Sequence, residues 1–273
     1  PSGNLLEKLV CKLVPDAKQP EQASELDERL LATPSIALER CHVLTAEMAA
    51  CASKTLRDSI ECLTNYTPAL AETAREGEKQ TDHYEDLLST YLVKLSSLKI
   101  SPDDSSEAAM LLKAIGDLER VGDHALNIVE AAEELVEKEA SFTEAAKQEL
   151  AVLVAAVEEI VDMSFRAFLE NDLTLAFQVE PLEQIIDDLK EQLRIRHILR
   201  LQQGNCSIET GFVWSDLLTA LERVGDHCSN IAGCVVDLAH HDMNTHEALR
   251  SARIENENFA KQYKEYANKY RLV

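Results

Sequence analysis

Pairs of carboxylates recur along this chain at a spacing of four residues. The pairs are Glu78/Asp82, Glu119/Asp123, Glu183/Asp187 and Glu222/Asp226. Residues four apart lie on nearly the same face of an α-helix, one turn from each other, so each pair would stack two negative charges. Stacked carboxylates repel unless a cation lies between them, and hard oxygen ligands suit Mg, Mn, Ca or Fe. The spacing therefore predicts metal-binding helix faces.

Two of these pairs lie inside a seven-residue block that occurs twice. Leu-Glu-Arg-Val-Gly-Asp-His at 118–124 returns unchanged at 221–227, an offset of 103 residues (221 minus 118). An exact repeat of this length indicates a repeated supersecondary unit. Because the block is rich in polar residues, we interpret its two copies as equivalent functional faces rather than as core-packing segments.

The arginine and a following asparagine of each copy are expected to support the carboxylates. Arg120 and Arg223 would pair with the neighbouring acids, with a contact to an anion as the alternative. Asn127 and Asn230 follow the aspartate by one helical turn, which predicts hydrogen-bond donors behind the metal ligands.

The histidine and glycine of each copy have different expected places. His124 and His227 follow the aspartate by one position, about 100° around the helix, which predicts a rim or surface position. Gly122 and Gly225 lie in mid-helix, where glycine costs roughly 1 kcal/mol relative to alanine. Close approach of a neighbouring helix and room for an ion are equally open explanations.

Helix pairing would bring the four acidic pairs together in two groups of four carboxylates. A helix over 68–99 and the next over 103–139 should be antiparallel neighbours joined by a short turn. Glu78 and Glu119 are 41 residues apart (119 minus 78), so both lie about 20 residues from that turn and level with each other. Glu183 and Glu222, 39 residues apart (222 minus 183), repeat this relation in the second half.

The composition and the helix signals predict an all-α fold of two tandem, pseudo-repeated three-helix bundles. The 273 residues include 45% hydrophobic but only 5% aromatic residues and little Gly or Pro, which suits helical bundles. Thr33-Pro34 and Ser101-Pro102 are typical helix starts. Helices are expected at about 33–65, 68–99, 103–139, 141–170, 173–202 and 207–240. The expected units are a lead-in segment (1–32), a first bundle (33–140), a second bundle (141–241) and a charged C-terminal helix (242–273). For the C-terminal helix, a solvated surface position and a docking or dimer role are both open.

The charge and the cysteines exclude several classes of protein. A net charge of −22 argues against a nucleic-acid partner, which needs clustered Lys and Arg. Seven cysteines without a CxxC pair argue against a disulfide scaffold or a thiolate zinc site and favour a reducing compartment. The sequence contains neither a signal peptide nor an apolar stretch of roughly 18 residues that could span a membrane. Because it begins at Pro1 without methionine, we expect a fragment of something longer.

At the repeated block, with its following Asn-Ile and its Glu-x-x-x-Asp partner one helix earlier, the sequence resembles the PhoU family of phosphate-uptake regulators. The resemblance covers about residues 36–240. It implies two three-helix bundles whose acidic pairs hold iron- or zinc-type metal clusters, while Mn or Mg would suit the same oxygen ligands. The implied ligands are Glu78, Asp82, Glu119, Asp123, Glu183, Asp187, Glu222 and Asp226. It also makes a homodimer a reasonable expectation.

The stretch Leu26–Leu31, followed by Thr33-Pro34, looks like the junction between a membrane domain and a PhoU-like tail in bacterial sodium–phosphate symporters. This resemblance implies a regulatory tail at the cytoplasmic face of the membrane, with the transporter domain in the same polypeptide. Since a chain of net charge −22 should repel phosphate, direct binding of the anion would need bridging metal ions.

Three alternatives remain. A di-iron carboxylate oxidase needs Glu-x-x-His from two helices, a spacing found only at Glu39/His42, so we do not expect an enzyme. A structural bundle would carry the acid pairs as solvated faces. A free-standing PhoU-type protein would regulate a separate transporter.

Overall fold

The computed structural model describes residues 26–240 and 257–272, and within these ranges every regular element is a helix. A short 3₁₀ helix, η1 (Glu28–Ala32), precedes the α-helices. The α-helices are α2 (Pro34–Cys62), α3 (Pro68–Ser96), α4 (Pro102–Glu137), α5 (Glu144–Leu169), α6 (Leu173–Gln202), α7 (Ile208–His240) and α9 (Glu257–Lys269).

Local capping explains where most of these helices begin. The side chains of Thr67, Ser101, Thr143 and Asp172 each accept a hydrogen bond from the backbone N–H three residues further on. Such caps satisfy an N–H group that has no partner within the helix. Thr33 makes no such bond, and proline occupies the first position of α2 instead. The observed helix bounds agree with the expected ones to within a few residues.

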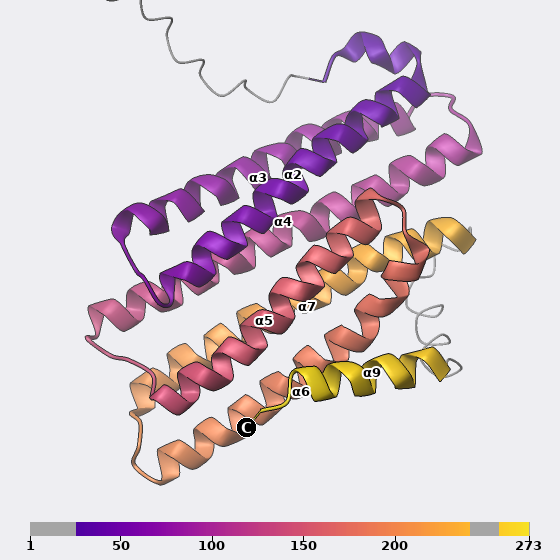
Figure 1. The fold of residues 1–273 in the computed structure, drawn as a ribbon. Coiled ribbons are helices and arrows are strands. Elements are labelled where there is room, and N and C mark those ends of the chain that lie inside the picture. The colour runs from indigo at the N-terminus through magenta and orange to yellow at the C-terminus, as the bar shows by residue number, and fades with distance from the viewer. Residues whose placement is uncertain (1–25, 241–256, 273) are drawn as a thin grey trace, which may run out of the picture.

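The helices form two bundles that pack side by side (Figure 1). Helices α2, α3 and α4 contact one another, as do α5, α6 and α7. The contact between α4 and α7 is the most extensive of all, so the two helices that carry the repeated block meet at the centre of the molecule. The predicted all-α fold of two three-helix bundles is confirmed.

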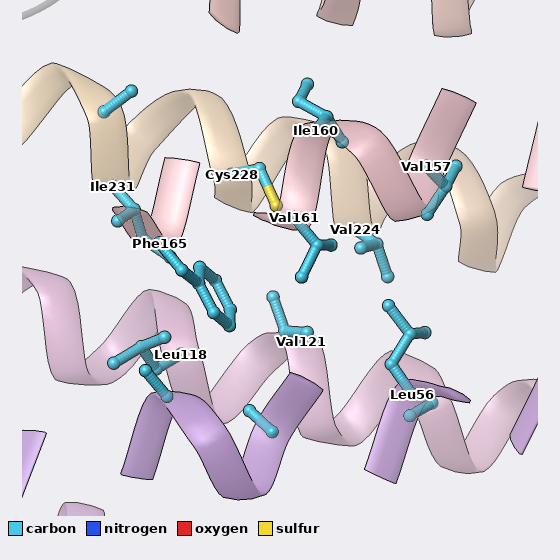
Figure 2. Close-up of a cluster of buried hydrophobic side chains, with 14 of the residues drawn as sticks. Leu56, Leu118, Val121, Val157, Ile160, Val161, Phe165, Val224, Cys228 and Ile231 are labelled. Carbon is cyan, nitrogen blue, oxygen red and sulfur yellow. The ribbon is translucent and has the colours of Figure 1, made fainter. Parts of the chain in front are cut away.

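The two bundles share one hydrophobic core. Buried side chains from α2, α4, α5 and α7 lie together between the bundles (Figure 2), among them Leu56, Val121, Val157 and Val224. The expected boundary between residues 140 and 141 therefore separates the helices into two sets but does not divide the core.

Both ends of the described chain pack against a bundle. Before η1, the backbone carbonyl of Asp27 accepts a hydrogen bond from the Tyr91 hydroxyl of α3 at 3.1 Å. Helix α9 lies along α6 (Figure 1), where the Tyr263 hydroxyl donates to Asp188 at 2.5 Å. The C-terminal helix is thus docked within the chain on one face, while the start of its expected segment lies in 241–256, outside the described residues. In the described ranges no helix is both long and apolar enough to cross a membrane.

Candidate metal centre

The two copies of the repeated block occupy equivalent places on α4 and α7. In each copy the leucine and the valine are fully buried, and Figure 2 shows Leu118, Val121 and Val224 in the core shared by the bundles. The glycines face the preceding helix. A Cβ atom on Gly122 would lie 3.6 Å from Thr81 of α3, and one on Gly225 would lie 3.4 Å from Ile186 of α6. A side chain of the preceding helix thus lies beside each glycine at ordinary van der Waals distance, and the contacts do not by themselves require glycine.

The first cluster consists of Glu78 and Asp82 on α3 with Glu119 and Asp123 on α4. Burial raises the pKa of Glu78, and the negative charges of Asp123 and Asp82 raise it further. Burial followed by the charge of Asp123 likewise raises the pKa of Glu119. Negative charges on α3 and α4 thus act on one another. Among the described residues, however, no three carboxylates of this first cluster come within 4.8 Å of one another.

The second cluster consists of Glu183 and Asp187 on α6 with Glu222 and Asp226 on α7. One oxygen from each of Glu183, Asp187 and Asp226 lies within 4.8 Å of the other two. Burial and the charge of Glu222 raise the pKa of Asp187 and of Asp226. Glu222 itself forms an ion pair with Lys190 of α6, at 3.0 Å between Nζ and Oε2.

The arginines of the two blocks adopt the same arrangement. Arg120 Nη1 lies 2.9 Å from Asp123 Oδ2, and Arg223 Nη1 lies 2.9 Å from Asp226 Oδ2. Both arginines are more than half exposed. The expected ion pairs are present, and each holds its aspartate at the solvent edge of a cluster while neutralising part of the negative charge.

The histidines and asparagines lie at the seam between α4 and α7 rather than behind the carboxylates. The rings of His124 and His227 stack with their centroids 5.4 Å apart. Asp117 Oδ1 lies 2.8 Å from His227 Nδ1 and accepts a hydrogen bond from Asn230 at 3.0 Å. Asn127 has His124 as its hydrogen-bond partner, at 3.3 Å. Through these contacts the four residues lie at the seam between α4 and α7. None of the contacts supports a role for the asparagines behind the metal ligands.

One further charged position lies on each cluster face and was not predicted from the sequence. Glu85 on α3 and Lys190 on α6 follow the second acid of their pair by three residues, one turn further along the same face. The signal was present in the repeat, since the 105-residue offset from Glu78 to Glu183 also aligns Glu85 with Lys190. A charge reversal at equivalent positions could have been found without coordinates.

The chemistry of both clusters fits a hard or borderline cation. In the second cluster the donors that converge are carboxylate oxygens, and in both clusters positive charge placed between the carboxylates would relieve their mutual repulsion. The arrangement that a di-iron oxidase requires is not built from Glu39 and His42. Glu39 is exposed, and His42 contacts Glu107 of α4 at 2.5 Å, away from both clusters.

Comparison with known proteins locates the chain in one family. The family model described as "PhoU domain" matches residues 45–132 and 150–235, so each matched segment contains one cluster. A Thermotoga maritima protein described as "phosphate-specific transport system accessory protein PhoU homolog 1" is 29% identical over 192 residues, which cover 67% of this chain and 79% of that protein. A Pseudomonas aeruginosa protein with the corresponding description is 27% identical over 222 residues, 80% of this chain and 89% of the relative.

Solved structures share the fold. The crystal structure of PhoU from Pseudomonas aeruginosa superposes with a TM-score of 0.70 at 23% identity, covering 77% of this chain and 99% of that one. The phosphate transport system regulatory protein PhoU from Streptococcus pneumoniae gives a TM-score of 0.68 at 18% identity over the same shares. Because the family model matches more than half of the sequence in two consecutive copies, the chain belongs to the PhoU family.

Proposed function

We propose that this chain regulates phosphate transport as a PhoU-type accessory protein and binds metal ions at its two carboxylate clusters. The observation that carries the metal binding is the convergence of Glu183, Asp187 and Asp226 to within 4.8 Å of one another. The repeated block supplies a second pair of acids, Glu119 and Asp123, beside Glu78 and Asp82 of α3, whose carboxylates raise one another's pKa values without the same convergence. The regulatory role is supported by the descriptions of the relatives, which name phosphate-specific transport systems.

The clusters would act as preformed but strained binding sites. Without a cation, the folded chain keeps half-buried carboxylates together against their mutual repulsion. Each arginine contacts the aspartate of its cluster through Nη1, and its Nε lies 3.5 Å from Glu119 Oε2 in the first cluster and 3.8 Å from Glu222 Oε2 in the second. A cation held by these carboxylates would supply positive charge to a chain whose net charge of −22 would otherwise repel phosphate.

For the partner, we propose a separate phosphate transport system, since both relatives are described as accessory proteins of such systems. The hypothesis of a symporter tail rests on the resemblance of residues 26–34, which here pack against α2 and α3. Sequencing the gene upstream of Pro1 separates the two hypotheses. Spanning helices encoded in frame would support the tail and contradict the accessory protein.

Elemental analysis of the purified chain tests the metal sites. We expect stoichiometric iron, zinc or manganese after chelator-free purification and reconstitution, and its loss in a variant with Glu119→Gln, Asp123→Asn, Glu222→Gln and Asp226→Asn. The matched control is Glu76→Gln, because Glu76 is an exposed acid on α3 outside the cluster. Metal content that is unchanged in the fourfold variant, or is zero in every protein, would contradict metal binding by these carboxylates.

Phosphate uptake tests the regulatory role. In cells that lack this gene, the wild-type chain and Glu76→Gln should restore the control of uptake by external phosphate. The fourfold variant should fail to restore it while accumulating to the same level. Equal uptake with and without the gene would contradict a role in phosphate transport even if the metal sites are real.

A further inference from the structure

The seam between α4 and α7 has two ends that the internal repeat makes comparable. Its middle is the stack of the His124 and His227 rings. The two helices are antiparallel here, because residues earlier on α4 contact residues later on α7. With the repeat offset of 103 residues (221 minus 118), each side chain at one end of the seam has a counterpart on the other helix at the opposite end. A group that is present at one end and missing at the other can therefore be identified position by position.

At the end next to His227, the chain itself supplies a carboxylate and an ammonium group. Asp117 Oδ1 lies 2.8 Å from His227 Nδ1 and accepts a hydrogen bond from Asn230 at 3.0 Å. One turn earlier on α4, the Lys113 ammonium lies 3.3 Å from Asp237 Oδ2. A cavity of about 70 Å³ remains beside this ion pair. This end of the seam is thus nearly filled by its own charged side chains.

At the end next to His124, both of these charged groups are missing. The counterpart of Asp117 is Ala220 (117 plus 103), whose methyl group cannot accept a hydrogen bond. The counterpart of Lys113 is Asp216 (113 plus 103), which carries the opposite charge. Relative to the other end, this end of the seam therefore lacks one carboxylate and one ammonium group.

The side chains that would contact the missing carboxylate and ammonium are nevertheless retained. They are His124, Asn127 and Glu134, the counterparts of His227, Asn230 and Asp237. Without a carboxylate beside them, the Asn127 amide and His124 Nδ1 contact each other at 3.3 Å. Glu134 pairs with Lys138 of its own helix, and because the two side chains are 40% and 44% exposed, this ion pair is a weak surface pair. The contact partners are thus present, while the groups that they bind at the other end are absent.

A cavity of about 380 Å³ lies at this end of the seam, a volume typical of small-molecule sites. Arg223 brings positive charge to the part of its wall next to His124, and three acids bring negative charge, namely Glu130, Glu134 and Asp216. These acids would repel a simple anion, whereas a simple cation would leave the donors at the His124 end without an acceptor. The walls therefore suit a ligand that carries both charges.

We propose that this cavity binds a small ω-amino acid, a zwitterion whose carboxylate and terminal ammonium take the places of the two groups that this end of the seam lacks. Its carboxylate accepts hydrogen bonds from Asn127 Nδ2 and His124 Nδ1, and its ammonium lies against Glu134 and Asp216. At the other end the two charged groups come from residues one helical turn apart, so the charges of the ligand are separated by about 6 Å or more. This inference does not depend on the proposed metal binding.

Isothermal titration calorimetry of the full chain, after removal of metal ions, tests the class of ligand with ε-aminocaproate as the probe. Caproate and hexylamine are matched controls with one charged group each, and glycine carries both groups too close together. Because each control leaves one end of the cavity without its partner, ε-aminocaproate should bind about tenfold more tightly than any of them. No binding of ε-aminocaproate, or equal affinity for caproate or hexylamine, would overturn the proposal.

Rebuilding the missing groups tests the position of the site. Ala220→Asp places a carboxylate beside Asn127, and Asp216→Lys places an ammonium beside Glu134, as at the other end of the seam. Each change should weaken the binding of ε-aminocaproate about tenfold or more, because a side chain then occupies the place of one ligand group. The control is Glu76→Lys, a charge reversal at an exposed acid of α3, which should leave the affinity unchanged.

The variants also distinguish a specific site from attraction to an acidic chain. Circular dichroism confirms that each variant is folded before it is titrated. An affinity that neither Ala220→Asp nor Asp216→Lys reduces would place the ligand elsewhere and overturn the proposal. An affinity that Glu76→Lys reduces as much as they do would reveal binding through net charge alone, which would overturn it as well.

Discussion

A single methyl group added at Gly77 should disturb the helix contact on which the first cluster is built. Gly77 precedes Glu78 on α3 and lies against α2. A Cβ atom at this position would lie 2.2 Å from Thr55 Oγ1 and 3.3 Å from Thr55 Cβ. The Gly77 carbonyl also accepts hydrogen bonds from Thr81 Oγ1 at 3.0 Å and Cys51 Sγ at 3.4 Å, so the backbone is fixed from two sides.

The size of the effect follows from opposing contributions. Alanine gains about 1 kcal/mol over glycine inside a helix. Against this, overpacking a buried contact costs about 1 to 3 kcal/mol. Thr55 is only 2% exposed, so its side chain has little room to turn away from the added methyl group. We therefore expect Gly77→Ala to lower the free energy of unfolding by up to about 2 kcal/mol, the overpacking cost less the gain in helix propensity.

Urea unfolding of the metal-free chain measures this difference from the shift in midpoint at constant slope. The matched control is Gly122→Ala, where the nearest atom would be 3.6 Å away, and it should gain up to about 1 kcal/mol. Adding Thr55→Ala removes the clashing oxygen, so the double variant should recover stability relative to the sum of the single changes. Equal stability of Gly77→Ala and Gly122→Ala would refute the argument from close packing.

Two further predictions concern charge. The pKa of Glu78 in the folded chain is raised above its ordinary value of 4.5. Between 4.5 and the raised pKa, the folded chain therefore binds more protons than the unfolded chain. The contribution of Glu78 to the free energy of unfolding consequently declines as pH rises. In urea unfolding without metal, Glu78→Gln should gain stability relative to wild type from about pH 4.5 upward. A gain that shrinks as pH rises would contradict the repulsion. Glu149 on α5 pairs with Arg196 at 3.0 Å and with the 12%-exposed Arg200 at 2.7 Å, both on α6, so Glu149→Gln should cost about 3 kcal/mol. A loss below about 1 kcal/mol in the same assay would place this group among weak surface pairs.

Much of the fold could be predicted from the sequence because its helices begin with local signals. The Ser101 hydroxyl accepts a hydrogen bond from the Asp104 N–H, as the Ser-Pro start of that helix indicated. The antiparallel pairing followed from short turns, and it correctly brought the carboxylates of α3 and α4 within mutual influence. Periodicity and turn length are properties of neighbouring residues, so they need no knowledge of long-range packing.

The seam between the bundles could not be predicted in this way. The sequence shows that His124 is turned away from Asp123, but not that α7 covers that side of α4. The contact with His227 joins residues 103 positions apart and depends on how two complete bundles pack. Asp117 is one of many acids in the sequence, and its hydrogen bond to Asn230 becomes visible only once α4 and α7 are side by side. The surroundings of His124 and His227 thus depend on the long-range packing of α4 against α7.

The shared core has a consequence for how this chain is made. When the ribosome has completed α4 but not yet α7, Leu118 and Val121 on the inner side of the first bundle have no counterpart to cover them. The incomplete chain would expose this apolar surface until α7 has been synthesised. Because α7 carries the same seven residues as α4, helix α4 of a second nascent chain could pack against this surface in place of α7. A gene cut between the bundles would yield two halves that each expose the apolar face which the intact chain buries between α4 and α7.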